Sequence, residues 1–126
     1  MSYGLSYAGY DVRIKQDVVL DPKEFTIAST VEHFNMPNDL LAQVTDKSSW
    51  ARQGLSVFNT VIEPGWNGYL TLELVNHSEC TRFISAGTPI AQIILFHLDR
   101  PVEKPYDGKY QGQPNRPVNS IMEKVQ

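Results

Sequence analysis

The clearest strand in this chain of 126 residues is Tyr69-Leu70-Thr71-Leu72-Glu73-Leu74-Val75-Asn76. Its leucines recur at every second position, and successive side chains of a β-strand point to opposite faces of the sheet. The leucines therefore share the face that meets the core. Glu73 lies on the opposite face, so its carboxylate points away from the leucines.

Short apolar runs on either side of this strand predict an all-β domain. Phe25–Val31 alternates with a period of two and is ended by Pro37. Leu40–Val44 gives another short strand. Ile90–Leu98 is apolar on both faces, so we expect a central strand that is covered on both sides. Gly and Pro, 8 of each, separate these runs, which is typical of short strands joined by tight turns.

The segment before Gly54 predicts one short helix. Ser48 can cap its start through the hydroxyl group, and Gly54 can stop it. Ser48 and Arg52 are four residues apart, so they lie on one face of the helix. Lys47 and Ser49 flank the helix start, where free backbone N–H groups favour an anion such as phosphate. The plain alternative is a serine cap beside a solvated arginine.

Length and charge bound the function of the chain. A chain of 126 residues, 41% of them hydrophobic, can bury one modest core, so we expect one domain. Its net charge of -3 argues against sequence-independent binding to nucleic acid or to a membrane surface. The sequence has neither an apolar run of transmembrane length nor the basic and apolar start of a signal peptide. We therefore expect a cytoplasmic protein, in the host cytoplasm if the source is viral.

The last part of the chain differs in composition from the rest. Residues 1–99 hold 6 Lys and Arg against 11 Asp and Glu, whereas residues 100–126 hold 5 against 3. The second segment is rich in Pro and Gly, which predicts a tail without a core of its own. Within it, Tyr106–Gln113 combines aromatic, lysine and glutamine side chains that could close over a nucleotide. A disordered chain end explains the same composition equally well.

Two carboxylates and one histidine motif are candidates for chemistry. Glu73 could act as a general base in a pocket, and its plain alternative is an exposed strand carboxylate. Glu63 opens a Pro-Gly segment that is first of all a turn, and second a loop that could bind a sugar. His77-Ser78-Glu79 matches half of a zinc deaminase signature, but that site needs two thiolates and Cys80 is the only cysteine. We therefore predict no zinc and no other metal held by the protein itself.

Six short segments follow one another in an order that is specific to one family. They are Gly4–Arg13, Lys47–Leu55, Glu63–Trp66, Leu72–Glu73, Ile90–Gln92 and Gly108–Gln113. Together they resemble the dCTP deaminase family, within the wider dUTPase-like superfamily. The resemblance implies a distorted β-barrel or jelly-roll-like fold over residues 1–99, with the tail at residues 100–126 closing over the nucleotide. It also implies a homotrimer with three active sites at the subunit contacts.

The resemblance further implies a role for each matching residue. Glu73 resembles the general base that activates water to attack C4 of cytosine, which converts dCTP to dUTP and ammonia. Ser48 and Arg52 resemble the residues that position this water and stabilise the transition state. The residues that resemble nucleotide contacts are Lys47, Ser49, Lys109 and Gln113 at the triphosphate, and Glu63, Tyr106 and Tyr110 at the sugar and base. Mg²⁺ would bind through the substrate triphosphate and take no part in deamination, and dTTP is a candidate inhibitor.

Two other functions stay open at this point. The segments around Ser48, Glu63 and Ile90 also resemble dUTP diphosphatases, so hydrolysis of dUTP, alone or combined with deamination of dCTP, is the enzymatic alternative. An inactive nucleotide-binding regulatory protein is the alternative from another class. The presence of Ser48, Arg52 and Glu73 together argues against that second alternative.

Overall fold

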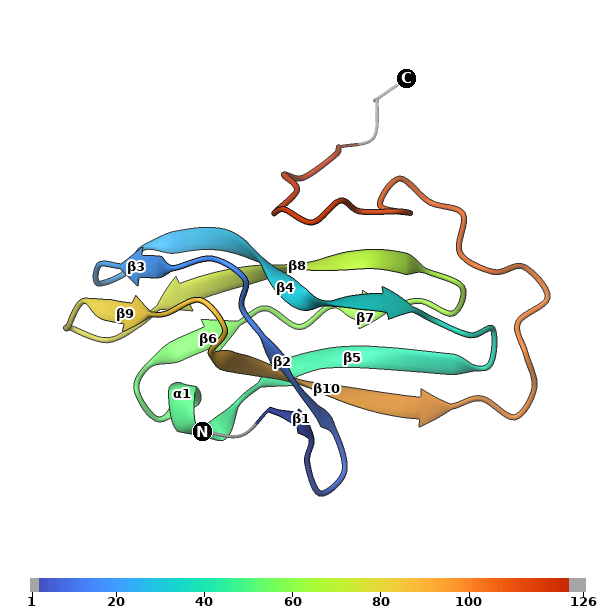
Figure 1. Ribbon diagram of the computed structural model, residues 1–126, viewed down its shortest axis with the longest axis horizontal. Coiled ribbons are helices and arrows are strands. Elements are labelled where there is room, and N and C mark those ends of the chain that lie inside the picture. Colours follow the sequence, from blue (N-terminus) through green and yellow to red (C-terminus); the bar gives the residue numbers. More distant parts are fainter. Residues whose placement is uncertain (1–2, 123–126) are drawn as a thin grey trace.

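The computed structural model describes residues 3–122, which form ten strands and one short helix (Figure 1). In chain order the elements are β1 (Gly4–Leu5), β2 (Tyr10–Arg13), β3 (Val18–Leu20), β4 (Phe25–Asn35), β5 (Leu40–Asp46), α1 (Ser48–Ala51), β6 (Leu55–Val57), β7 (Val61–Ile62), β8 (Asn67–Asn76), β9 (Arg82–Ile84) and β10 (Pro89–His97). The predicted strands correspond to β4, β5, β8 and β10, and the predicted helix corresponds to α1.

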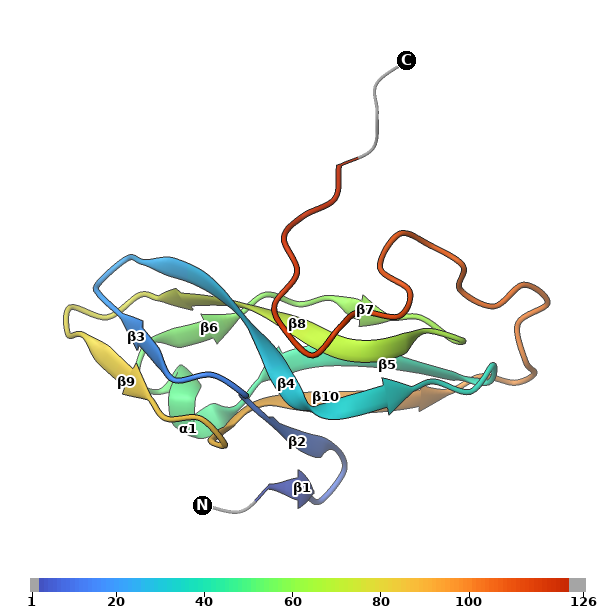
Figure 2. The ribbon, with the colours of Figure 1, turned by 45° about the horizontal axis from the view of Figure 1, so that its top comes forward.

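The strands form three antiparallel sheets, of which the two larger ones lie in separate layers. The largest sheet has the order β1-β2-β10-β5-β7, the second has the order β4-β8-β6, and β3 pairs with β9. Figures 1 and 2 show β4 and β8 running over the five-stranded sheet. Spatial neighbours such as β2 and β10 are far apart in sequence, which makes the topology jelly-roll-like. The all-β, jelly-roll-like prediction is confirmed, although the described strands stay in separate sheets and close no single barrel.

The leucines of β8 point into the core between the two layers. Leu72 and Leu74 are fully buried and Leu70 is nearly so, and they join buried side chains of the five-stranded sheet in one hydrophobic cluster. Burial of each such side chain stabilises the fold by about 1.5–3 kcal/mol. This free energy fixes which face of β8 turns inward, and it places Glu73 on the outer face.

The central place of β10 in its sheet is confirmed, but its predicted cover on both sides holds for only part of its length. Ile90 and Ile93 are buried, whereas Leu95 and Phe96 are 48% and 46% exposed. The reason lies in the neighbouring strand: β2 pairs with β10 only as far as Ile93, so β5 alone flanks the remainder.

α1 begins differently from the prediction. Lys47 is the N-cap residue and no side chain caps the helix, so the prediction that Ser48 is the cap is wrong. Ser48 is already the first helical residue, and the Lys47 side chain pairs with Asp11 at 2.7 Å. Gly54 ends the turn with a φ of 88°, and a Cβ there would lie 2.9 Å from the Ser78 Cβ, so glycine is required. No helix within residues 3–122 is long and apolar enough to cross a membrane.

The tail leaves β10 at one end of the molecule and returns to lie against β8 (Figure 2). The backbone N–H of Gly112 donates to the Asn67 carbonyl at 2.9 Å, and the Tyr69 N–H donates to the Gln113 carbonyl at 3.1 Å. Gly68 and Gln113 consequently form a parallel bridge. The main chain of the tail therefore extends the sheet beside the start of β8.

Candidate active site

A cleft of about 820 Å³ opens beside Glu73, and Leu70, Thr71 and Glu73 of β8 line it. Its walls come from β4, from the residues around β7 and from the tail. Five of the residues expected at the reaction centre and the nucleotide line it, namely Glu63, Glu73, Tyr106, Tyr110 and Gln113. The cleft therefore brings together one acidic group from a rigid strand and several polar groups from the tail.

Glu73 is held by sheet pairing in half-buried surroundings. It lies opposite Ile27 of β4, and its carbonyl accepts a hydrogen bond from the Phe58 N–H at 3.1 Å. Phe25, Ile27 and Val61 supply apolar walls to the same cleft. Burial raises the pKa of the Glu73 carboxyl, although a hydrogen bond from its own backbone N–H acts against that rise. A carboxyl with a raised pKa holds a proton more readily, which suits a group that must accept a proton and pass it on.

The tail is fastened to the cleft by side chains as well as by its main chain. Trp66 Nε1 donates to the Tyr110 carbonyl at 2.7 Å, and the Tyr106 N–H donates to the Pro64 carbonyl at 2.9 Å. Thr71 Oγ1 donates to Gln113 Oε1 at 2.8 Å. These contacts hold the aromatic residues of the tail at the mouth of the Glu73 cleft.

Two glycines allow this close approach: Gly65 in the turn before β8, and Gly68 at the start of β8 itself. A Cβ on Gly65 would lie 2.5 Å from the Pro105 Cβ, and a Cβ on Gly68 would lie 2.6 Å from the Gln113 nitrogen. Both glycines also have a positive φ, of 87° and 140°. The segment that the sequence presents first as a turn is therefore also the surface on which the tail docks.

Tyr110 is a tail residue whose side chain lines the cleft. Its hydroxyl oxygen accepts a hydrogen bond from the Ile121 N–H at 3.0 Å, and this bond, followed by one with the Ser120 side chain, lowers the pKa of the phenol. The Lys109 ammonium group lies 5.5 Å from the centre of the Tyr110 ring. The predicted phosphate contact and the predicted base contact are thus neighbours in the same stretch of tail.

A second cleft, of about 570 Å³, contains other members of the predicted site. Lys47 and Ser48 line it together with Asp11, which is only 6% exposed. Asp11 Oδ2 accepts from Lys47 Nζ at 2.7 Å, while Asp11 Oδ1 is buried without a hydrogen-bond partner among the described residues. This ion pair fixes a lysine beside the start of α1. Ser49 and Arg52, also on or next to α1, are exposed and line neither cleft.

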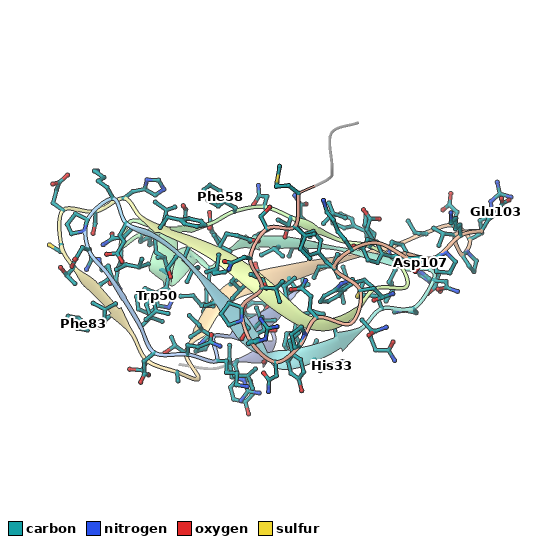
Figure 3. All side chains as sticks on the ribbon, turned by 90° about the horizontal axis from the view of Figure 1, so that it is seen from above. His33, Trp50, Phe58, Phe83, Glu103 and Asp107 are labelled. Carbon is teal, nitrogen blue, oxygen red and sulfur yellow. The ribbon has the colours of Figure 1, made fainter. Side chains whose placement is uncertain are left out.

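Within one chain the two halves of the predicted catalytic set lie apart. The two clefts share no lining residue, so Glu73 and Ser48 face different spaces. Figure 3 shows Trp50 of α1 toward one end of the molecule and Asp107 of the tail toward the other. Figures 1 and 2 likewise show α1 and the tail on opposite sides of the sheets. Arg52 lines neither cleft, so one chain does not bring Glu73, Ser48 and Arg52 into a common space.

Comparison with known proteins identifies the family. The family model of dCTP deaminase-like proteins matches residues 9–98, which is well over half of the chain. This chain belongs to the dCTP deaminase-like family.

Curated relatives agree with this membership. A dCTP deaminase of Herpetosiphon aurantiacus is 35% identical over an alignment of 145 positions. The alignment covers 90% of this family member and 79% of the relative. A dCTP deaminase of Campylobacter fetus is 37% identical over 145 residues, with coverage of 90% and 78%. The resemblance stated from sequence motifs is therefore confirmed at the level of the family.

Solved structures agree on the fold. The native dUTPase of EIAV has a TM-score of 0.66 and 25% identity, and the match covers 81% of this family member and 85% of that protein. A dUTPase of Staphylococcus bacteriophage 80alpha, solved with dUpNHpp, has a TM-score of 0.68 and 21% identity, with coverage of 82% and 84%. A phage phi11 dUTPase, described with a structural Mg(II) ion, has a TM-score of 0.69 and 19% identity, with coverage of 86% and 88%. The fold of this deaminase-like chain is therefore dUTPase-like.

The histidine motif has a structural use in this deaminase-like chain. His77 Nε2 lies 2.8 Å from Ser56 Oγ, and Cys80 is exposed. Within residues 3–122, no three His, Cys, Asp or Glu side chains are grouped so that they could hold a metal ion. The His77 side chain therefore connects the loop after β8 to β6.

Sequence reasoning missed two residues that the structure brings to these clefts. Thr71 connects β8 to the tail, and Asp11 holds Lys47. Asp11 lies within the first segment that resembles the family, so that resemblance was the available signal for it. Thr71 gave no such signal, because an outward-facing threonine in a strand is ordinary.

Proposed function

We propose that this chain is a dCTP deaminase, which hydrolyses dCTP to dUTP and ammonia with Glu73 as the general base. The observation that supports this most is the half-buried Glu73 carboxyl in a cleft with apolar walls, next to the docked tail. Family membership supports the same reaction, because the relatives that cover most of the chain are named dCTP deaminases.

The proposed reaction needs one group that moves protons in two steps. Water is a weak nucleophile, so Glu73 takes a proton from it as the oxygen bonds to C4 of cytosine, and passes that proton to N3. Glu73 then takes the remaining hydroxyl proton and passes it to the amino group at C4. The carbon–nitrogen bond breaks, ammonia leaves, and a carbonyl group stays at C4.

We assign the tail and the adjacent loop to the nucleotide. Glu63, Tyr106 and Tyr110 line the Glu73 cleft and would contact the sugar and base. Gln113 in the cleft and Lys109 next to Tyr110 would contact the triphosphate, since amide and ammonium groups donate hydrogen bonds to phosphate oxygens. The tail would then close over the bound substrate and exclude water, as lids do in many enzymes.

We further propose that the complete site forms between copies of the chain in a homotrimer. Ser48 and Arg52 from one copy would approach Glu73 of another, to position water and stabilise the transition state. Lys47 and Ser49 would add triphosphate contacts from the same side. Two observations support this arrangement: the clefts that contain Glu73 and Ser48 are separate within one chain, and Phe25 and Phe58 are half exposed beside the Glu73 strand.

Mg²⁺ would arrive bound to the substrate triphosphate, and dTTP would compete for the same nucleotide site. The protein would act in the cytoplasm, where deoxynucleotides are made. A dUTP diphosphatase, or an enzyme with both activities, is the second candidate, because the similar solved structures are dUTPases. An inactive nucleotide-binding regulator is the third.

One assay separates these functions. The purified chain is incubated with dCTP or with dUTP in the presence of Mg²⁺, and ammonia and pyrophosphate are measured in each reaction. Ammonia from dCTP without pyrophosphate is the expected result. Ammonia with pyrophosphate indicates the bifunctional enzyme, and pyrophosphate from dUTP alone indicates the diphosphatase. Nucleotide binding without either product would reject the enzyme assignment in favour of the regulator.

A further inference from the structure

Thr71 lies on β8 two residues before Glu73, so both side chains are on the same face of the strand. It is 8% exposed, although it belongs to the outer face of β8, because the tail covers it. Both Thr71 and Glu73 line the large cleft. A buried hydroxyl group at this position must find hydrogen-bond partners, and the tail supplies them.

The Thr71 hydroxyl holds the tail at two points. Its oxygen accepts a hydrogen bond from the Val118 N–H at 3.1 Å, and it donates to Gln113 Oε1 at 2.8 Å. Residues 113 and 118 are therefore fastened to the same atom of β8, and the segment between them forms a closed loop against the cleft.

The direction of these bonds follows from the protons available. A backbone N–H can only donate, so Thr71 must act as the acceptor toward Val118. A hydroxyl group has one proton, which remains for Gln113. The amide oxygen of Gln113 must therefore face Thr71, and its NH₂ group must point away from Thr71.

The backbone of Gln113 is already fixed on β8. What Thr71 adds at this residue is a fixed orientation of the side-chain amide group. The Gln113 carbonyl accepts from the Tyr69 N–H, and the residue bridges Gly68. The two ends of an amide have nearly the same shape and differ in whether they donate or accept. Only the orientation that Thr71 selects offers two N–H donors to an anionic ligand.

We propose that Thr71 is a positioning residue for the nucleotide: it clamps tail residues 113–118 onto the Glu73 strand and sets the Gln113 amide to donate to a nucleoside triphosphate. The ligand part of this inference rests on the proposed function, which assigns Gln113 to the phosphates. The clamp itself rests on the two hydrogen bonds of Thr71.

The first test compares three variants in steady-state deamination. Thr71→Val keeps the shape and removes the hydroxyl, so the KM for dCTP should rise by about tenfold while kcat changes less than about threefold. Thr71→Ser keeps the hydroxyl and should restore the wild-type KM. Thr26→Val is the matched control, because Thr26 pairs with Leu74 on the core face of the same sheet, outside the cleft. An unchanged KM in Thr71→Val, or an equal rise in Thr71→Ser, would overturn the assignment.

The second test uses no nucleotide. Within residues 99–122, trypsin can cut only after Lys109, because Arg100, Lys104 and Arg116 each precede proline. Thr71→Val should speed that cut at least about threefold over wild type, and Thr71→Ser and Thr26→Val should not. Equal cutting rates in Thr71→Val and wild type would reject the clamp. If the wild-type chain releases no ammonia from dCTP, the proposed function fails, and this cleavage assay still decides whether Thr71 holds the tail.

Discussion

Replacing Glu73 with glutamine removes the proton acceptor of the cleft and keeps the size of the side chain. A positioned general base contributes about 10² to 10⁴-fold to a rate, so ammonia release from dCTP should fall by at least about a hundredfold. A hundredfold loss corresponds to about 2.7 kcal/mol of transition-state free energy, at about 1.36 kcal/mol for each factor of ten. Nucleotide affinity should stay close to that of the wild type, because the tail and the apolar walls of the cleft are unchanged.

The same substitution should leave the fold intact. Burial raises the pKa of the Glu73 carboxyl, so the folded state disfavours its ionised form. Such a group lowers stability as the pH rises through its unfolded and then its folded pKa, and has no effect below both. Glutamine is neutral at every pH, so at neutral pH the variant should melt at the wild-type temperature or above it.

The assay combines three measurements on one preparation: ammonia release, nucleotide binding by calorimetry, and thermal melting. Glu79→Gln is the matched control, because Glu79 is an exposed carboxylate in the loop after β8 and should be dispensable for turnover. Turnover near the wild-type rate in a folded Glu73→Gln protein that binds nucleotide would refute the general-base role.

Three further outcomes follow from the cleft, the tail and the proposed assembly. In the pH profile of kcat/KM, the acid limb should lie above the usual pH range of a glutamate, because burial raises the pKa of Glu73 and its ionised form is the base. Phe25→Ser would hydrate one wall of the cleft and should move that limb to lower pH. Gly68→Ala should raise the KM for dCTP, measured at constant enzyme concentration, because the added Cβ would lie 2.6 Å from the Gln113 nitrogen and displace the tail. Arg52→Ala and Glu73→Gln chains should each be inactive, yet refolding them together in equal amounts should restore about a quarter of wild-type activity, since sites between copies can combine one intact residue from each. A mixture without activity would contradict the shared site.

The fold could be predicted where the sequence of a single strand specifies its buried face. The leucines of β8 specify one buried face, so the outward position of Glu73 followed from the alternation alone. The cover of β10 could not be predicted in the same way, because it depends on where β2 stops, and Leu95 and Phe96 do not encode that. The helix start was predicted wrongly for a similar reason. The N-cap residue is Lys47, and its side chain pairs with Asp11, which is distant in sequence.

The candidate site was predictable as a set of residue types more than as an arrangement. Glu63, Glu73 and Gln113 do line one cleft, although they come from a loop, a strand and a tail that are far apart in sequence. The placement of Ser48 in a separate cleft depends on how the sheets stack, which no single motif reports. Thr71 escaped notice because its contribution comes entirely from contacts with a distant segment.

The docked tail also pairs with main-chain groups at a sheet edge that would otherwise be unpaired. β6 pairs only with the last residues of β8, Leu74–Asn76, and the tail supplies the main-chain partners beside Asn67 and Tyr69. Edge strands with unpaired main-chain groups can pair with strands from other molecules and so promote aggregation. Shortening the chain before Gly112 would uncover these groups, so loss of solubility would accompany loss of nucleotide affinity. Point substitutions that keep the main chain in place are therefore the better way to study what the tail contributes to binding.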